Sequence, residues 1–262
     1  MNFFLLVAVV QIVTESFPIS SSGHVRLLEQ LFKQAGIALH DSQRLAAFVD
    51  VMHLPTIIII GLLLYPLWLI RKPLWQWIPV VFVVDSVTIF FYCVWHIVGT
   101  GWFPLGVGFA VSGACLASVR WCPQHVSQGI GVRSIEQLAS DWFALLLLGC
   151  AQGIALLPGI SRFGITYTAG RWLGLRSPDA FVVSFVVQAP LLVLGIGRGY
   201  WRLLQSGVPV IGSHGLFIAV VSASSVGAYY SLRWMYCLAV RDRLWLVAWY
   251  MMVPIAVWVL GG

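Results

Sequence analysis

The sequence predicts an all-α integral membrane protein with six transmembrane helices and two re-entrant helical hairpins in two inverted repeats. Hydrophobic residues make up 60% of the 262 residues and charged residues only 9%, whereas soluble domains carry about 25% charged residues. Six apolar stretches are long enough to cross a bilayer, which takes about 20 residues each. They are apolar throughout, whereas the strands of a membrane barrel alternate. A cytosolic enzyme, a disordered chain and a secreted disulfide scaffold are therefore excluded.

The loops between the predicted spans indicate how the chain is oriented, because basic loops stay in the cytoplasm. With the basic loops 71–72, 120–133 and 241–243 placed there, the spans alternate and both chain ends lie outside. Arg198 and Arg202 then fall outside as well and break the rule. Residues 122–133 and 201–213 are expected to be loops. The six predicted spans cover residues 45–70, 74–97, 102–119, 179–197, 214–238 and 244–260.

Two further apolar stretches, residues 3–28 and 142–175, are interrupted by polar, proline and glycine residues. The first break runs from Glu15 to His24 and the second from Pro158 to Gly164. Irregular backbone at membrane depth is tolerated only where protein or a water-filled cavity satisfies its polar groups. We therefore expect two re-entrant hairpins that line a site.

The two breaks match each other when the sequence is shifted by 141 residues. Each is followed by three predicted spans, so a unit of one hairpin and three spans crosses the membrane an odd number of times and the second unit is inverted. The first repeat comprises residues 1–119 and the second 138–262 of a single membrane domain, 1–262. Inverted repeats with broken helices place their ligand near the bilayer midplane, between the copies. The matched pairs are Gln11 and Gln152, Ile19 and Ile160, Ser20 and Ser161, and Gly23 and Gly164.

Glu15 is the charged residue of the first break, four positions after Gln11. This spacing puts both side chains on one helical face. A carboxylate at membrane depth is costly and is by default a functional candidate. Glu15 is expected to hold a divalent cation or to act as a base. The alternative is a structural carboxylate that caps the backbone amides of residues 20–22.

The segment Ser20-Ser21-Ser22-Gly23-His24 supplies three hydroxyls, a flexible glycine and an imidazole. Serine is a good N-cap, so the segment is expected to start a helix. Helix N-termini and Gly/Ser turns offer free N–H groups to anions. A serine close to a histidine suggests a nucleophile or a proton shuttle. A structural histidine near a helix start is the alternative.

The second break adds a cation, Arg162, within an apolar hairpin. An unpaired guanidinium is strongly disfavoured there, so it needs an anionic partner. Its rigid fork of donors suits phosphate oxygens, and Ser161, Thr166 and backbone N–H groups complete a cradle. A structural ion pair between Arg162 and Glu15 is the alternative. A phosphate site at this depth suits a lipid phosphate, whose hydrocarbon chain stays among the lipid tails.

Three segments resemble the signatures of one bacterial family, the undecaprenyl-diphosphate phosphatases, also called bacitracin-resistance proteins. Residues 11–24 are similar to its (E/Q)GxTExxPxSSxGH motif and residues 158–166 to its PGxSRSGxT motif. Residues 184–190 are similar to its SFLLxxP segment. With the two hairpins and six spans, the resemblance covers nearly the whole chain.

The resemblance implies hydrolysis of the terminal phosphate of undecaprenyl diphosphate at the outer face of the bacterial cytoplasmic membrane. This reaction recycles the lipid carrier for peptidoglycan synthesis and lessens bacitracin sensitivity. It also implies dependence on a divalent cation, magnesium or calcium. The implied sites are Gln11 and Glu15 for the metal; Glu15, Ser21, His24 and Arg162 for catalysis; and Ser20, Ser22, Ser161, Arg162 and Thr166 for phosphate.

The sequence departs from the family pattern at several positions. Ile12 replaces the usual glycine, and Phe163 replaces the second serine of SRSG. Gln11 stands where many members carry glutamate, and His53 where glutamine is common. Val182 occupies the place of an acidic residue that often precedes SFLL. These departures bear on substrate range and rate, and they leave the set of Glu15, Ser21, His24 and Arg162 intact.

Several alternatives are compatible with the sequence. The nucleophile is Ser21, His24 or a metal-bound water. A polyprenyl-phosphate transporter, or flippase, would use the same midplane phosphate site, and a membrane subunit with a relic site would bind lipid without turning it over. The expected partners are the polyprenyl diphosphate substrate, membrane lipids and a second copy of the chain in a homodimer. No nucleic-acid partner is expected, because the net charge of +6 resides in topology-determining loops.

Overall fold

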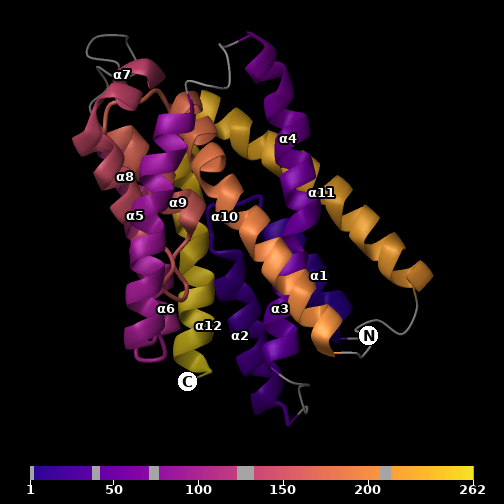
Figure 1. The fold of residues 1–262 in the computed structure, drawn as a ribbon. Coiled ribbons are helices and arrows are strands. Elements are labelled where there is room, and N and C mark those ends of the chain that lie inside the picture. The colour runs from indigo at the N-terminus through magenta and orange to yellow at the C-terminus, as the bar shows by residue number, and fades with distance from the viewer. Residues whose placement is uncertain (1–2, 37–41, 71–76, 123–132, 207–213, 262) are drawn as a thin grey trace.

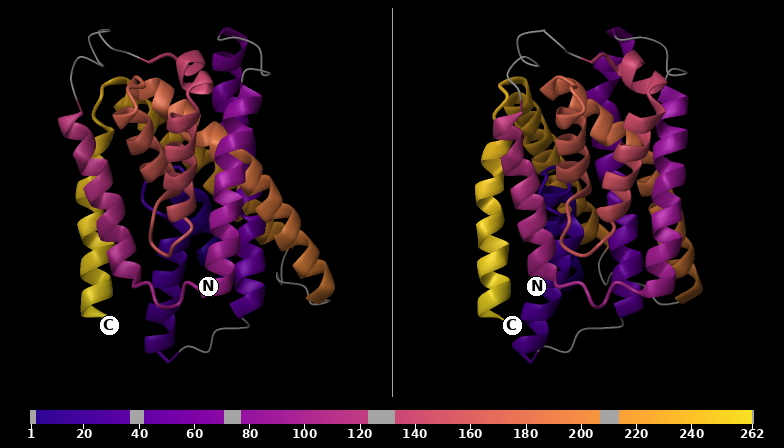
Figure 2. Two further views of the ribbon diagram at one scale, coloured as in Figure 1. Left: turned by 60° about the vertical axis from the view of Figure 1, so that its left-hand side comes forward. Right: turned by 90° about the vertical axis from the view of Figure 1, so that its left-hand side faces the viewer.

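The chain folds into a bundle of helices in a computed structural model that describes residues 3–36, 42–70, 77–122, 133–206 and 214–261 (Figure 1). Among these residues there is no β-strand, and one isolated bridge pairs Arg133 with Leu175. The predicted all-helical class is therefore confirmed. Both chain ends lie at one end of the molecule and helix α7, Ile135–Ser140, at the other, in every view (Figures 1 and 2).

The first half of the chain forms α1 (Phe3–Thr14), α2 (Ser21–Gln34), α3 (Ser42–Val51), α4 (His53–Ile70), α5 (Trp77–Val98), α6 (Leu105–Ser118) and the 3-10 turn η2 (Val119–Trp121). The second half forms α7, α8 (Trp142–Ile154), α9 (Arg162–Trp172), α10 (Ser177–Ser206), α11 (His214–Val240), η4 (Leu244–Met251) and α12 (Met252–Leu260).

Four of the six predicted spans are confirmed as helices of membrane-crossing length and composition: Gln43–Leu63, Trp77–Val98, Ser177–Ser206 and Gly215–Val240. Large apolar side chains stay exposed on their outer faces, such as Phe82 of α5, as expected of surfaces that meet lipid. The predicted spans 102–119 and 244–260 form shorter apolar helices, Leu105–Trp121 and Leu244–Leu260. Their crossing of the membrane stays a prediction, as does the re-entrant character of the helix pairs α1–α2 and α8–α9.

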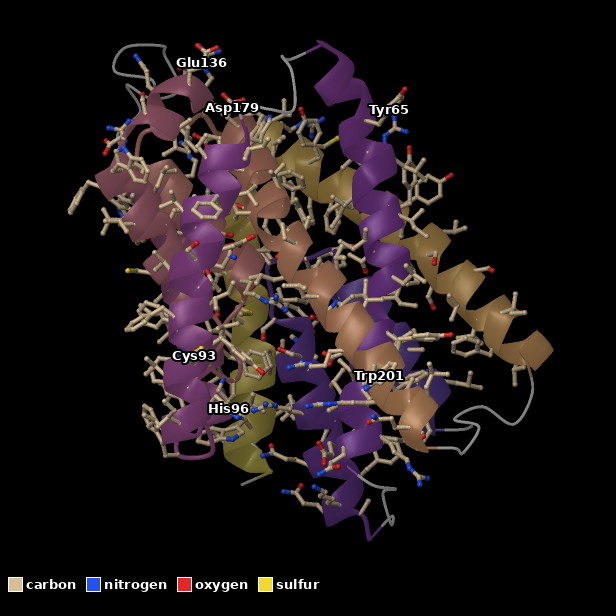
Figure 3. All side chains as sticks on the ribbon, viewed as in Figure 1. Tyr65, Cys93, His96, Glu136, Asp179 and Trp201 are labelled. Atoms are coloured by element: carbon tan, nitrogen blue, oxygen red, sulfur yellow. The ribbon has the colours of Figure 1, made fainter. Side chains whose placement is uncertain are left out.

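Two boundaries differ from the sequence-based expectation. The stretch predicted as one span, 45–70, bends at Met52 between α3 and α4. Pro55 explains the bend, because it has no N–H to donate to the carbonyl of Val51 and its ring crowds that carbonyl. Helix α10 runs on to Ser206, so the loop expected from Trp201 onward was wrong for residues 201–206 (Figure 3). Within the part of α10 that extends beyond the predicted span, Arg198 is paired with Asp50 of α3 at 2.9 Å.

The two helix pairs that contain the breaks both contact helices of the other half of the chain. Helix α1 packs against α11, and α8 packs against α5. Helix α2 contacts α12 as well as α6, and α9 contacts α6 but packs most extensively against α10 of its own half. An inverted repeat predicts contacts between the halves, because each hairpin then lies against the spans of the other unit. The repeat and its boundaries remain a proposal that this packing supports.

Helix α6 holds the second break in place. The hydroxyl of Ser112 accepts a hydrogen bond from the backbone N–H of Ser161 at 2.8 Å and donates to the carbonyls of Gly108 at 3.0 Å and Gly159 at 3.3 Å. Gly159 has a φ of +80°, a conformation that glycine adopts readily. A Cβ atom at Gly108 would lie 2.0 Å from the carbonyl oxygen of Pro158. This close backbone contact fixes the position of the second break along the axis of α6.

We expect Gly108→Ala to destabilise the protein, because the new methyl group meets backbone that has no room to yield. Overpacking of this kind costs about 1–3 kcal/mol, which lowers the melting temperature of a domain of this size by about 2–4 °C per kcal/mol. Thermal unfolding in detergent measures the effect. The matched control is Gly227→Ala on α11, where nothing lies within 4 Å of the added atom. Equal melting temperatures for the two variants would contradict the tight packing inferred at Gly108.

Candidate active site

One small pocket brings the two breaks together. From the first break it is lined by Glu15, Ser20, Ser21 and Ser22, and from the second by Ser161 and Arg162. The carboxylate of one half of the chain and the guanidinium of the other therefore face a shared space. The remaining lining residues are Phe17, Ile160, Phe163 and Gln188.

The first break forms because α1 ends at Thr14 and the chain turns before α2 begins. Ser20 adopts a left-handed conformation, with a φ of 66°, and its side chain accepts a hydrogen bond from the N–H of Gly23 at 3.3 Å. Ser20 is thus the N-cap that the sequence predicts. A Cβ atom at Gly23 would lie 2.9 Å from the ring of Phe109, so a glycine lets α2 approach α6 closely.

The second break repeats the serine cap, although Ser161 has an extended backbone conformation rather than a left-handed one. Ser161 caps α9, and its side chain accepts from the N–H of Gly164 at 3.0 Å. The pairs Ser20 with Gly23 and Ser161 with Gly164 therefore play the same structural part, as the 141-residue shift predicts. The N-termini of α2 and α9 both begin at the pocket, and helix N-termini favour anions through their unpaired N–H groups and their dipole.

Glu15 lies within a network of polar side chains. The amide nitrogen of Gln11 donates to its Oε2 at 3.0 Å, and the hydroxyl of Ser21 donates to the same oxygen. The Nδ1 atom of His53 lies 3.6 Å from Glu15 Oε2 and 3.3 Å from Gln11 Nε2. Glu15 thus accepts hydrogen bonds from side chains, and among the described residues its carboxylate accepts none from the backbone N–H groups of residues 20–22. The capping alternative is not what this arrangement shows.

The oxygens beside Glu15 bear on metal binding. The Oε1 atom of Gln11 is buried without a hydrogen-bond partner. Within the described ranges no group of three or more His, Cys, Asp or Glu side chains is arranged to hold a metal ion. Magnesium is commonly bound by one or two carboxylates together with substrate phosphates and water. The pair of Glu15 and Gln11 fits an ion of this kind, held jointly by protein and substrate.

Arg162 begins α9 and is partly exposed. Its guanidinium makes no ion pair or hydrogen bond with another side chain in the part of the chain that the structure describes, so the ion pair with Glu15 that was the structural alternative is not formed. An unpaired guanidinium between apolar helices is available to an anion. Arg162 also lines a second, larger pocket of about 430 Å³.

This larger pocket, which we call the chamber, shares Arg162 with the small pocket and is lined in part by α10. Three of its polar residues are paired with one another, since Arg198 Nη2 lies 2.9 Å from Asp50 Oδ2 and Arg198 Nη1 donates to the hydroxyl of Tyr92 at 3.3 Å. Its walls are mainly apolar. The lining residues are Asp50, His53, Thr88, Ile89, Tyr92, Leu156, Arg162, Leu191, Leu192, Leu194, Gly195 and Arg198.

His24 does not line the small pocket. Its Nδ1 lies 2.8 Å from the carbonyl oxygen of Ser20. A carbonyl only accepts, so Nδ1 carries the proton and Nε2 accepts from the Tyr250 hydroxyl at 3.1 Å. Burial lowers the pKa of His24, which lies in α2, outside the four spans, and this favours the neutral imidazole. Tyr250, which also stacks on His24 at 5.7 Å, was missed because no motif surrounds it in the last predicted span.

Thr166 is not among the pocket-lining residues either. It is buried, and its hydroxyl donates to the carbonyl of Arg162 at 2.7 Å. Threonine within a helix often forms this bond to the preceding turn. The phosphate contact predicted for Thr166 gains no support from this placement, and its bond instead ties it to the turn that carries Arg162.

Helices of membrane-crossing length, with an unpaired guanidinium and a carboxylate facing one pocket, define an integral membrane protein with a site for an anion. The chain belongs to the bacitracin resistance protein BacA family, whose profile matches residues 4–257. It is similar to three curated proteins named undecaprenyl-diphosphatase. That of Thermus thermophilus is 31% identical, covering 97% of this chain and 94% of the relative. The protein of Thermotoga maritima is 30% identical, covering 85% of this chain and 90% of the relative. The protein of Carboxydothermus hydrogenoformans is 26% identical, covering 100% of this chain and 95% of the relative.

Proposed function

We propose that the protein hydrolyses undecaprenyl diphosphate to undecaprenyl phosphate and inorganic phosphate. The observation that carries the proposal is the shared pocket. There Glu15 accepts a hydrogen bond from the Ser21 hydroxyl, and the Arg162 guanidinium has no side-chain partner among the described residues. A diphosphate brings the anionic oxygens that Arg162 lacks, and the names of the relatives give the same substrate class.

The phosphate-binding side of the site is the start of α9. Arg162 offers a planar fork of donors to the terminal phosphoryl group. The N–H groups at the first turn of α9 and the hydroxyl of Ser161 add further donors, and those of Ser20 and Ser22 face them from the first break. Charge that develops on the phosphoryl oxygens in the transition state is stabilised by these fixed donors.

The opposite side of the site activates the nucleophile. The Ser21 hydroxyl donates to Glu15, which is the geometry in which a carboxylate takes the proton as the serine oxygen attacks. Attack on the terminal phosphorus breaks its bond to the bridging oxygen and releases undecaprenyl phosphate, and water then frees the phosphate from Ser21. A water bound to the same carboxylate is the alternative nucleophile. His24 faces Tyr250 and is a less direct candidate.

A divalent cation, magnesium or calcium, would be held by Glu15 and by the unpartnered Oε1 of Gln11, and it would neutralise charge on the phosphate oxygens. Gln11 orients the carboxylate through its own bond to Oε2 at 3.0 Å. His53 lies beside the side chains of Glu15 and Gln11, so its protonation would change the net charge of this site.

The lipid part of the substrate is accommodated by the chamber. Its leucine and isoleucine walls suit the first isoprene units, and Arg162 connects them to the phosphate site. We place the protein in the bacterial cytoplasmic membrane, with the site reached from the outer face. The common end at which both termini lie would then be external (Figure 1). In this setting the reaction recycles the lipid carrier for cell-wall synthesis and lessens bacitracin sensitivity.

The rival functions are less well supported. A polyprenyl-phosphate transporter would need the phosphate-binding half of the site but not the Ser21–Glu15 contact. All three of the curated relatives bear the name of a hydrolase rather than that of a transporter. A relic site would lack part of the set, whereas Glu15, Ser21 and Arg162 all line the pocket.

The test is a phosphate-release assay with purified protein in detergent and farnesyl or undecaprenyl diphosphate. We expect release of inorganic phosphate with magnesium or calcium, and its loss with a chelator that is reversed by adding the ion back. Transport of the lipid in vesicles without phosphate release would favour the transporter. Phosphate release that a chelator does not reduce would support the proposed hydrolase and contradict the proposed requirement for a metal ion.

A further inference from the structure

Gln188 is a side chain of the pocket whose role neither the motifs nor the mechanism above explains. It lies on α10 and is only 2% exposed. It lines the same pocket as Ser161 and Arg162. Its amide nitrogen is buried and has no hydrogen-bond partner. A buried N–H donor without a partner loses its hydrogen bonds to water and forms none in the protein. Such donors are rare in folded proteins unless a water, ion or ligand accepts the hydrogen bond.

The neighbouring glutamine, Gln152, shows that the helix interface can satisfy an amide nitrogen at this depth. Its Nε2 donates to Asp85 at 2.9 Å and to the carbonyl of Val187 at 3.2 Å. Gln188 follows Val187 directly on α10, yet its own nitrogen has no such partner. The difference between the two residues is that Gln188 faces the pocket.

Phe163 gives a chemical reason for a donor at this place. It follows Arg162 and lines the pocket, but it has no polar atom to offer. Its ring packs against Phe185 of α10, with centroids 4.5 Å apart. Gln188 lies three residues after Phe185, which puts it on the same face of α10. Phe163 thus packs against the face of α10 that carries Gln188, and Gln188 lines the same pocket as Arg162.

We propose that Gln188 is a further substrate-binding residue, whose amide donates a hydrogen bond to a phosphoryl oxygen of the group that Arg162 holds. This inference rests on the proposed phosphate site. A neutral amide adds a directed donor without adding charge, so it complements a guanidinium that is shared between the pocket and the chamber.

The test uses Gln188→Leu, which keeps the approximate volume and removes the amide. Inorganic phosphate is titrated into the detergent-solubilised protein by calorimetry, and kcat and KM are measured for phosphate release from farnesyl diphosphate. A hydrogen bond to a charged group predicts a loss of about 10- to 100-fold in phosphate affinity and in kcat/KM. The melting temperature without phosphate should be unchanged or raised, because the variant removes an unsatisfied buried donor.

The matched control is Thr56→Val, which removes another buried polar atom without a partner. The Thr56 hydroxyl is unpaired as well, but the residue lines neither the pocket nor the chamber. We expect Thr56→Val to leave phosphate affinity unchanged, with a melting temperature that is equal or higher. The contrast separates loss of a ligand contact from a general change in the core.

Wild-type phosphate affinity and kcat/KM in Gln188→Leu would overturn the inference. So would losses that appear only with a matching fall in melting temperature, which indicate a structural role. If the leucine variant fails to fold, Gln188→Met repeats the test with an unbranched apolar chain. A wild-type protein that binds phosphate but releases none from lipid diphosphate would defeat the proposed function, while the calorimetric comparison would still decide the role of Gln188.

Discussion

Arg162→Ala is expected to lower kcat/KM for hydrolysis of polyprenyl diphosphate by about a thousandfold, the scale of removing an arginine that stabilises a transferring phosphoryl group. The reason is its position. Arg162 has no partner among the described side chains and lines both the pocket and the chamber. Its removal leaves only neutral protein groups as hydrogen-bond donors to the phosphoryl oxygens. Phosphate release from farnesyl diphosphate, followed over a range of substrate concentrations, measures the loss.

Two further variants make the Arg162 result specific. Arg162→Lys keeps the charge but not the planar fork, so its kcat/KM should fall between those of alanine and wild type. The control is Arg120→Ala. Arg120 is exposed and stacks over the ring of Trp245 at 4.9 Å, a contact worth about 0.5–1 kcal/mol. The kcat/KM of the Arg120→Ala variant should stay near that of the wild type. An Arg162→Ala variant as active as wild type would remove the phosphate-binding assignment.

The residues that could be predicted from the sequence are those whose chemistry conflicts with their surroundings. A guanidinium and a carboxylate in apolar stretches each require a partner or a ligand, so Arg162 and Glu15 were identifiable without coordinates. The caps Ser20 and Ser161 were identifiable because helix starts depend on residues three positions apart. The caps depend on neighbouring residues, and the two charges stand out because burying them is costly. Both kinds of signal are visible in the sequence alone.

The contributions that could not be predicted depend on contacts between distant segments. Tyr250 meets His24 across 226 residues, and nothing around either position indicates the pairing. Gln188 is neutral, so its presence in a span raises no strong expectation until its missing partner is seen. For Thr166 the motif predicts a phosphate contact, which stays a prediction. Its hydroxyl donates to the carbonyl of Arg162 in its own helix, a bond that threonine often forms within helices.

Among the helix boundaries, too, some follow from the local sequence and others depend on contacts between distant segments. The bend at Met52 follows from Pro55, whose effect is local. The length of α10 was underestimated, because the span was placed at about 20 residues and the helix continues through Arg198 to Ser206. Arg198 is paired there with Asp50 of α3 at 2.9 Å, a tertiary contact that the sequence does not reveal.

Glu15→Gln is expected to lower kcat by about a hundredfold to ten-thousandfold, the range for loss of a general base. The substitution keeps the side-chain length and removes the charge. It leaves the Ser21 hydroxyl without a carboxylate to receive its proton, and it weakens the oxygens proposed to hold the cation. The concentration of magnesium or calcium needed for half-maximal activity should rise as well. Rates measured over a titration with each ion report both effects.

A double-mutant cycle with Ser21→Ala decides how Glu15 acts. If Glu15 serves chiefly to activate Ser21, the double variant should be no slower than the slower single variant, because residues that act as a unit are not additive. If the two losses multiply, Ser21 is not the group that Glu15 activates, and a water takes its place. The control is Glu29→Gln, which breaks the 2.7 Å ion pair with Lys33 on α2. That pair is partly exposed and worth little, so the variant should keep its rate and its cation requirement, and a Glu15→Gln variant that did the same would exclude Glu15 from the reaction.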